Sequence, residues 1–172
     1  RWSINMLIEL FCGNMPRPMN YFSSRTDVKF NRNAGRTGST WEFLQRLRDG
    51  WHGKLIVKGV QCPEDAINIK NLGVDSIYVS NHGGRQLNSA PTVVDSIESM
   101  RNLLGNDFPL IYDGSIRNGE HVVKAMALGA NFVMLGRSVM YGLGAGANRG
   151  LSNILDNIEN ETKTSMGLVG CC

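Results

Sequence analysis

The chain has 172 residues, of which 42% are hydrophobic and 19% charged, a length that accommodates one ordinary core. This composition excludes an intrinsically disordered chain and predicts one domain or part of one. The formal net charge of +3 is uneven, because residues 1–58 carry ten Lys or Arg against four Asp or Glu, and the remainder carries eight against eleven. The basic segment favours a solvated loop over an anion-binding surface. Aromatic and basic residues do not alternate in a stacking pattern, so we expect no nucleic-acid partner.

The four cysteines indicate reduced thiols rather than a disulfide framework or a metal site. They show no CxxC or metal-finger spacing, which suits a cytoplasmic setting. The longest apolar run, Met6–Cys12, is too short to cross a bilayer, and the first residues lack the order of a signal peptide. Because the first residue is Arg1 rather than Met, we expect the chain to be a piece of a longer protein.

The first fifty residues predict two helices separated by a long loop. Apolar residues recur at helical spacing between Ile4 and Phe11, so we expect a short amphipathic helix there. Residues 14–38 have no sustained period and predict a loop that is either functional or disordered. Ser39 and Glu42 form a capping box that opens the second helix. Three of its apolar residues are expected to face inward: Phe43, Leu44 and Leu47.

From residue 55 onward, strand and helix signals alternate four times. Short apolar runs predict strands over residues 55–58, 76–80, 109–112 and 132–135. Capping residues and helical periodicity predict helices over residues 63–73, 92–105, 119–128 and 152–166. This alternation predicts an α/β fold of parallel strands with right-handed crossovers, whose carboxyl ends open on one face. The absence of a GxGxxG motif disfavours a Rossmann sheet, and four strands do not close a (β/α)8 barrel.

The stretch Ser80–Asn88, SNHGGRQLN, begins at the end of the second predicted strand and carries residues suited to chemistry. His82 can accept a proton and Arg85 can bind a carboxylate, while the two glycines between them allow a tight turn. A carboxylate held beside a base brings the hydroxyl of the adjacent carbon to the imidazole, which favours a 2-hydroxy acid. The alternative for a lone histidine is a structural role, which we expect for His52 and His121.

The loops after the last two strands predict a phosphate site. Asp113–Gly119 and Gly136–Ser138 each contain an arginine and lead into a helix, whose N-terminal N–H groups favour a phosphate monoester. The alternative is that their glycines serve tight turns only. Because barrels commonly bind phosphate after strands seven and eight, the visible strands would be the last four of eight. Lys58 ends the first strand and would either stabilise negative charge on a cofactor ring or an enolate, or be a solvated lysine.

These motifs, in this order and spacing, closely resemble those of the FMN-dependent L-2-hydroxy acid dehydrogenase/oxidase family, which includes L-lactate dehydrogenases and (S)-mandelate dehydrogenase. The resemblance runs through essentially all of the chain. It implies the C-terminal half, about strands five to eight, of a (β/α)8 TIM barrel over residues 39–172, preceded by a loop and short amphipathic helix over residues 1–38. It also implies FMN as cofactor and oxidation of an L-2-hydroxy acid of the lactate or mandelate type to the 2-oxo acid.

The resemblance implies a role for each motif residue. His82 would take a proton from the substrate, either by direct abstraction or from the hydroxyl as hydride moves to the flavin. Arg85 would bind the substrate carboxylate, and Lys58 would stabilise the reduced flavin at its N1/O2 edge. Ser80 would contact the flavin region. The residues that would hold the ribityl phosphate end are Asp113, Gly114, Ser115, Ile116, Arg117, Gly136 and Arg137.

Two positions depart from the usual family pattern without removing a catalytic group. Asn88 stands where Asp is usual, and the pair Gly114-Ser115 stands where Gly-Gly or Ser-Gly is commoner. The family's first four strands supply further flavin contacts, a substrate-binding tyrosine and the aspartate that orients the histidine, and they would precede Arg1. We therefore expect the isolated chain to be inactive. The alternative is a non-catalytic half-barrel that binds FMN or phosphate only.

In membrane-bound bacterial members that this chain resembles, a segment in the place of residues 1–38 attaches to the membrane. The basic bias of this segment and its apolar helix are compatible with peripheral contact. We expect either a cytoplasmic enzyme or one that is peripheral on the inner face of the cell membrane. The resemblance further implies that the intact enzyme is a homo-oligomer.

Overall fold

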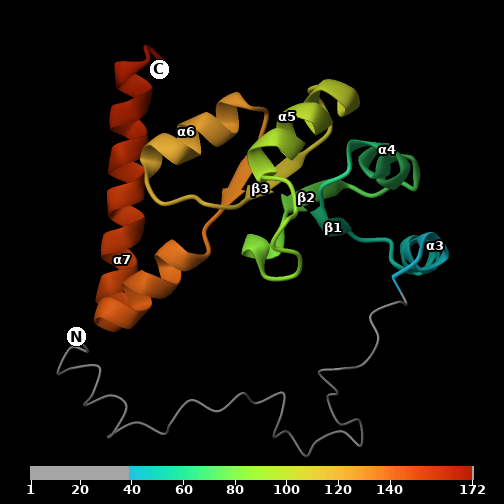
Figure 1. The fold of residues 1–172 in the computed structure, drawn as a ribbon, viewed down its shortest axis with the longest axis horizontal. Coiled ribbons are helices and arrows are strands. Elements are labelled where there is room, and N and C mark those ends of the chain that lie inside the picture. Colours follow the sequence, from blue (N-terminus) through green and yellow to red (C-terminus); the bar gives the residue numbers. More distant parts are fainter. Residues whose placement is uncertain (1–38, 172) are drawn as a thin grey trace, which may run out of the picture. The chain divides into compact units, whose positions relative to one another are not determined.

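The computed structural model describes residues 39–171 (Figure 1). The chain divides into two units, Arg1–Arg46 and Leu47–Cys172, and the second carries the whole sheet. The predicted helix between Ile4 and Phe11, the predicted loop over 14–38 and the predicted membrane contact lie outside the described residues. Across residues 39–171, no helix combines the length and the apolar character needed to cross a bilayer.

Helix α3 (Trp41–Gly50) begins one residue later than the predicted capping box implies. Thr40, rather than Ser39, acts as the cap, because its Oγ1 accepts a hydrogen bond from the N–H of Phe43 at 3.2 Å. Phe43 is 46% exposed and Leu47 is 40% exposed, so the predicted inward orientation of these two residues is wrong. The reason is that helical periodicity identifies an apolar face without showing what covers it.

The predicted alternation of four strands and four helices is confirmed. The strands are β1 (Ile56–Val60), β2 (Ser76–Ser80), β3 (Leu110–Asp113) and β4 (Phe132–Met134). They pair in parallel in the order β1-β2-β3-β4. The helices that follow them are α4 (Pro63–Asn71), α5 (Val93–Leu104), α6 (Gly119–Ala127) and α7 (Arg137–Leu168). Pro63 in the first turn of α4 and Thr92 before α5 start these two helices as predicted.

The core lies between the sheet and the helices that pack against one of its faces (Figure 1). Ile77 and Val79 of β2 have no exposed surface, and neither have Ile97 and Met100 of α5. Because side chains alternate between the faces of a strand, the intervening residues of β2 point to the other face. That second face carries the polar residues that form the site.

Helix α7 differs most from its prediction, because it begins fifteen residues earlier than expected. It consists of two helical segments joined by a kink at Gly146 and Ala147, where the backbone leaves helical geometry. The segments approach closely at Gly142 and Gly150, since a Cβ on Gly150 would overlap the carbonyl oxygen of Gly142. The glycines that allow this contact interrupt the apolar periodicity of the first segment. A helix is predicted from that periodicity, so the first segment was not predicted.

Candidate functional site

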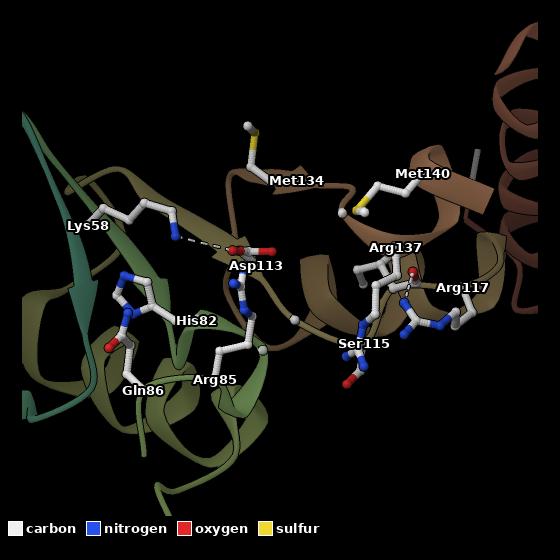
Figure 2. A pocket seen from close by; sticks show the side chains of 14 residues that line it. Lys58, His82, Arg85, Gln86, Asp113, Ser115, Arg117, Met134, Arg137 and Met140 are labelled. Carbon is white, nitrogen blue, oxygen red and sulfur yellow. Dashed lines mark hydrogen bonds and ion pairs between the residues drawn. The ribbon is translucent and has the colours of Figure 1, made fainter. Parts of the chain in front are cut away.

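A cleft of about 400 Å³ lies toward the carboxyl ends of the four strands (Figure 2). Its lining residues come from β1, the segment after β2, the end of β3 and the β3–α6 loop, β4, and the start of α7 with the residue before it. They are Lys58, His82, Gly83, Arg85, Gln86, Asp113, Gly114, Ser115, Ile116, Arg117, Met134, Gly136, Arg137 and Met140. The parallel strand order thus brings together every residue predicted for the site except Ser80, which does not line the cleft.

Two methionines of the cleft were missed by the sequence reasoning. Met134 is the last residue of β4, and Met140 lies in the first turn of α7. Met140 stands three residues after Arg137, a spacing that places two helical residues on one face. Helical spacing from Arg137 could have identified Met140, but no motif marks either methionine.

Ser80 has no exposed surface, and its hydroxyl binds two residues that line the cleft, Lys58 and Asp113. Its Oγ donates a hydrogen bond to Oδ2 of Asp113 at 2.9 Å. The same oxygen accepts hydrogen bonds from Nζ of Lys58 at 3.3 Å and from the backbone N–H of His82 at 3.1 Å. These three bonds use the one hydrogen and both lone pairs of the hydroxyl. Ser80 therefore ties the ends of β1, β2 and β3 together.

Lys58 projects into one end of the cleft and is held there by three groups. Its Nζ lies 3.5 Å from Oδ2 of Asp113, 3.3 Å from Oγ of Ser80, and 4.6 Å from the centre of the Tyr78 ring. Burial disfavours the phenolate of Tyr78, and the charge and hydrogen bond of Asp113 add to this, which raises the pKa of Tyr78 to about 12. Tyr78 is therefore neutral at physiological pH and presents an uncharged ring to the cation.

His82 occupies an unusual backbone conformation at the start of a short helical turn, η1 (His82–Gly84). Its φ is 54°, and the φ values of Gly83 and Gly84 are 66° and 76°. Oδ1 of Asn81 accepts a hydrogen bond from the N–H of Gly83 at 3.0 Å, which stabilises the turn. Left-handed backbone is uncommon for a residue other than glycine and clusters at functional sites. The turn exposes the His82 side chain to the cleft.

The start of α7 forms the opposite end of the cleft. Gly136 is the N-cap residue, no side chain caps it, and a Cβ at this position would meet nothing within 4 Å. In α6, by contrast, Oδ1 of Asn118 accepts from the N–H of His121 at 3.0 Å, and Oε2 of Glu161 accepts from the N–H of Gly119 at 2.9 Å. Of the two helix N-termini predicted to bind an anion, only that of α7 lacks a side-chain cap.

A buried serine joins the two loops at this end. Oγ of Ser138 donates to the carbonyl oxygen of Ile116 at 2.8 Å, and Nη1 of Arg117 donates to the same oxygen at 3.1 Å. Figure 2 shows Arg117 and Arg137 together at this end of the cleft, whereas Lys58 and His82 lie at the other end. The cleft can therefore bind an anionic group at one end and offer a base and a cation at the other.

The profile of the FMN-dependent dehydrogenase family matches residues 2–172. The chain belongs to this family. Among curated relatives, the L-lactate dehydrogenase of Acinetobacter baumannii is 40% identical over 131 residues, which is 76% of this chain and 34% of the relative. The L-lactate dehydrogenase of Acinetobacter baylyi matches with the same identity and coverage. The chain thus spans about a third of the length of these relatives.

Solved structures of a mandelate oxidase and an (S)-mandelate dehydrogenase show the same fold over the matched part of the chain. A mandelate oxidase crystallised with benzoyl-formic acid is 36% identical, with a TM-score of 0.74 over 77% of this chain and 40% of that one. An (S)-mandelate dehydrogenase is 38% identical, with a TM-score of 0.73 over 77% of this chain and 37% of that one. The predictions of this family and of part of a (β/α)8 barrel are therefore confirmed. Across residues 39–171, no three His, Cys, Asp or Glu residues are grouped so as to hold a metal ion.

Proposed function

We propose that these residues form the C-terminal half of an FMN-dependent enzyme that oxidises an L-2-hydroxy acid of the lactate or mandelate type to the 2-oxo acid. The observation that carries this proposal is a single cleft with His82 and Arg85 in one part and Arg117 and Arg137 in another. The similarity to L-lactate dehydrogenases, and to a mandelate oxidase and an (S)-mandelate dehydrogenase, supports the substrate class.

The donor groups of the cleft fit FMN. The guanidinium groups of Arg117 and Arg137, with the uncapped N-terminus of α7 at Gly136, suit a phosphate monoester. The loop over residues 113–117 would complete the site for the ribityl phosphate end. Lys58 lies at the other end of the cleft, where its cation would stabilise negative charge on the flavin ring. FMN, when bound, supplies the acceptor for the two electrons that leave the substrate.

Arg85 and His82 would bind and deprotonate the substrate. The guanidinium of Arg85 offers two parallel N–H donors to the substrate carboxylate. A carboxylate held there leaves the hydroxyl-bearing carbon next to it within reach of the exposed imidazole of His82. The imidazole then accepts a proton, either from that carbon or from its hydroxyl.

We assign Ser80 an indirect role in the cofactor site. Its hydroxyl is buried, and its hydrogen and lone pairs are used by Asp113, Lys58 and the His82 backbone. The contact with the flavin region that the family resemblance implies for Ser80 would therefore act through these neighbours rather than through its own hydroxyl.

The purified 172-residue chain, supplied with FMN, should oxidise lactate or mandelate negligibly. The physical reason is that the chain covers 34% of the L-lactate dehydrogenases it matches, and the remaining strands would complete the flavin and substrate contacts. Anaerobic bleaching of the flavin absorbance by each substrate measures this directly. Turnover at the rate of a full-length relative would contradict the half-enzyme proposal.

A second candidate function is a half-barrel that binds FMN or phosphate without catalysis, favoured by the short coverage of the relatives. The coding sequence upstream of Arg1 distinguishes the two. Four further strand–helix units there would support the enzyme, whereas their absence would support the binding protein.

Replacing Arg117 or Arg137 by Met should weaken FMN binding about tenfold each, because each substitution removes a charge-assisted hydrogen bond to phosphate. Titration of flavin fluorescence measures this, and Arg149→Met on the exposed surface of α7 is the matched control. Riboflavin, which lacks the phosphate, should bind the original chain and both variants with similar affinity. Equal affinity of the original chain for FMN and riboflavin would refute the phosphate assignment.

Two further features of the intact enzyme stay predictions. They are its assembly as a homo-oligomer and its cytoplasmic location, with or without peripheral membrane contact through residues 1–38. Sedimentation velocity of the intact enzyme and its flotation with anionic vesicles would test them separately.

A further inference from the structure

Strand β1 contains a bulge next to the proposed catalytic residues. Lys58 pairs with Tyr78 and Val60 pairs with Val79, so β1 has one residue more than β2 between these two pairs. That extra residue is Gly59, with a φ of +93°. A bulge of this kind commonly re-aims the side chains beside it and is frequent near active sites.

The absence of a side chain at Gly59 makes room for the His82 ring. A Cβ at residue 59 would lie 2.6 Å from Cε1 of His82, 3.4 Å from Nδ1 and 3.5 Å from Nε2. The first of these distances is too short for two carbon atoms, so any side chain at residue 59 would displace the imidazole. The ring therefore rests against the backbone of β1.

The main chain and the side chain of His82 are thus held by different strands. Its backbone N–H donates to Oγ of Ser80 at the end of β2, which holds the main chain. Its ring contacts Gly59 of β1, which limits the directions that the imidazole nitrogens can take. The same bulge directly follows Lys58, whose Nζ is held by Asp113 on β3.

We propose that the bulge at Gly59 is a positioning device for the imidazole of His82, and that a side chain at residue 59 would turn this base away from the substrate. This inference rests on the proposed function for its effect on catalysis. The contact itself does not depend on that function and can be tested separately.

Gly59→Ala has a matched control in Gly105→Ala. Both glycines have positive φ values, +93° and +77°, so an alanine is strained at either position. A Cβ at Gly105, which ends α5, meets nothing within 4 Å. The two substitutions therefore share backbone strain and differ in the contact with His82.

The first experiment uses NMR on the 172-residue chain with labelled histidines. A nuclear Overhauser effect between the Cε1 proton of His82 and the α protons of Gly59 should be seen, and Gly59→Ala should shift the Cε1–H resonance of His82 more than Gly105→Ala does. His52 and His121 serve as internal references. The absence of the Overhauser effect would overturn the inference even if Gly59→Ala failed to fold.

The second experiment measures kcat, KM and flavin content in the intact enzyme. Gly59→Ala should lower kcat by tenfold or more, with KM within about twofold and flavin retained, because a small misplacement of a reacting group is costly. Gly105→Ala should leave kcat within about twofold. If His82→Ala abolishes turnover and Gly59→Ala does not lower kcat, the positioning role is wrong. If neither His82→Ala nor Gly59→Ala changes kcat, the proposed role of His82 as the base is wrong, and the positioning role of Gly59 is wrong with it.

Discussion

Replacing His82 by Ala in the intact enzyme should lower kcat by about a hundred- to ten-thousand-fold while the yellow flavin stays bound. The loss follows from removing the base, because no other histidine lines the cleft among the described residues. The flavin should remain because its phosphate would be held by Arg117 and Arg137 at the other end of the cleft. Single-turnover reduction of the bound flavin measures the chemical step apart from product release.

His52→Ala is the matched control for this substitution, because His52 is exposed and lies outside the cleft. His52→Ala should leave kcat within about twofold of the kcat of the unsubstituted enzyme. Loss of flavin from the His82 variant, with a normal rate per remaining flavin, would contradict the role of His82 as a base.

Replacing Arg85 by Met should lower kcat/KM for lactate or mandelate by about a hundredfold or more, because the substrate carboxylate loses its partner and its orientation. Arg85→Lys keeps the charge but loses the fork of two parallel donors, so its kcat/KM should fall between those of the original and the Met variant. Steady-state kinetics on each purified variant measures both effects.

The methyl ester of the substrate provides the sharper test of Arg85. An ester has no carboxylate charge, so its kcat/KM should be low with the original enzyme and change little with Arg85→Met. If Arg85→Met lowered kcat/KM for the acid and the ester by the same factor, Arg85 would not recognise the carboxylate. Arg149→Met, on the exposed surface of α7, should leave kcat/KM unchanged for both the acid and the ester.

The helices and strands from residue 55 to 134 could be predicted because their signals are local. Apolar runs, capping residues and glycine stops mark these elements, and the four strands lie within a few residues of their predicted positions. The helix α7 was predicted only in its second part. Its first part contains glycines that serve contact between its own two segments, and contact of that kind is not readable from periodicity.

The membership of the cleft could also be predicted largely from the sequence. In a parallel α/β sheet the carboxyl ends of the strands and the residues after them meet at one end, and Lys58, His82, Asp113 and Arg137 therefore gather in one cleft. The burial of Ser80 could not be predicted in this way. Its hydroxyl is directed to three protein partners because the strands around it approach in register, Ser80 opposite Asp113.

The sequence by itself determined the family, the alternation of strands and helices, and the residues that can do the chemistry, because each of these depends on residue types at fixed spacing along the chain. The tertiary structure alone decided which of two helix N-termini is uncapped, how Lys58 is held, and why residue 59 has no side chain. The last two of these features depend on atoms from different strands that meet in space: Gly59 adjoins His82 although 22 residues separate them in the sequence, because β1 and β2 pair side by side.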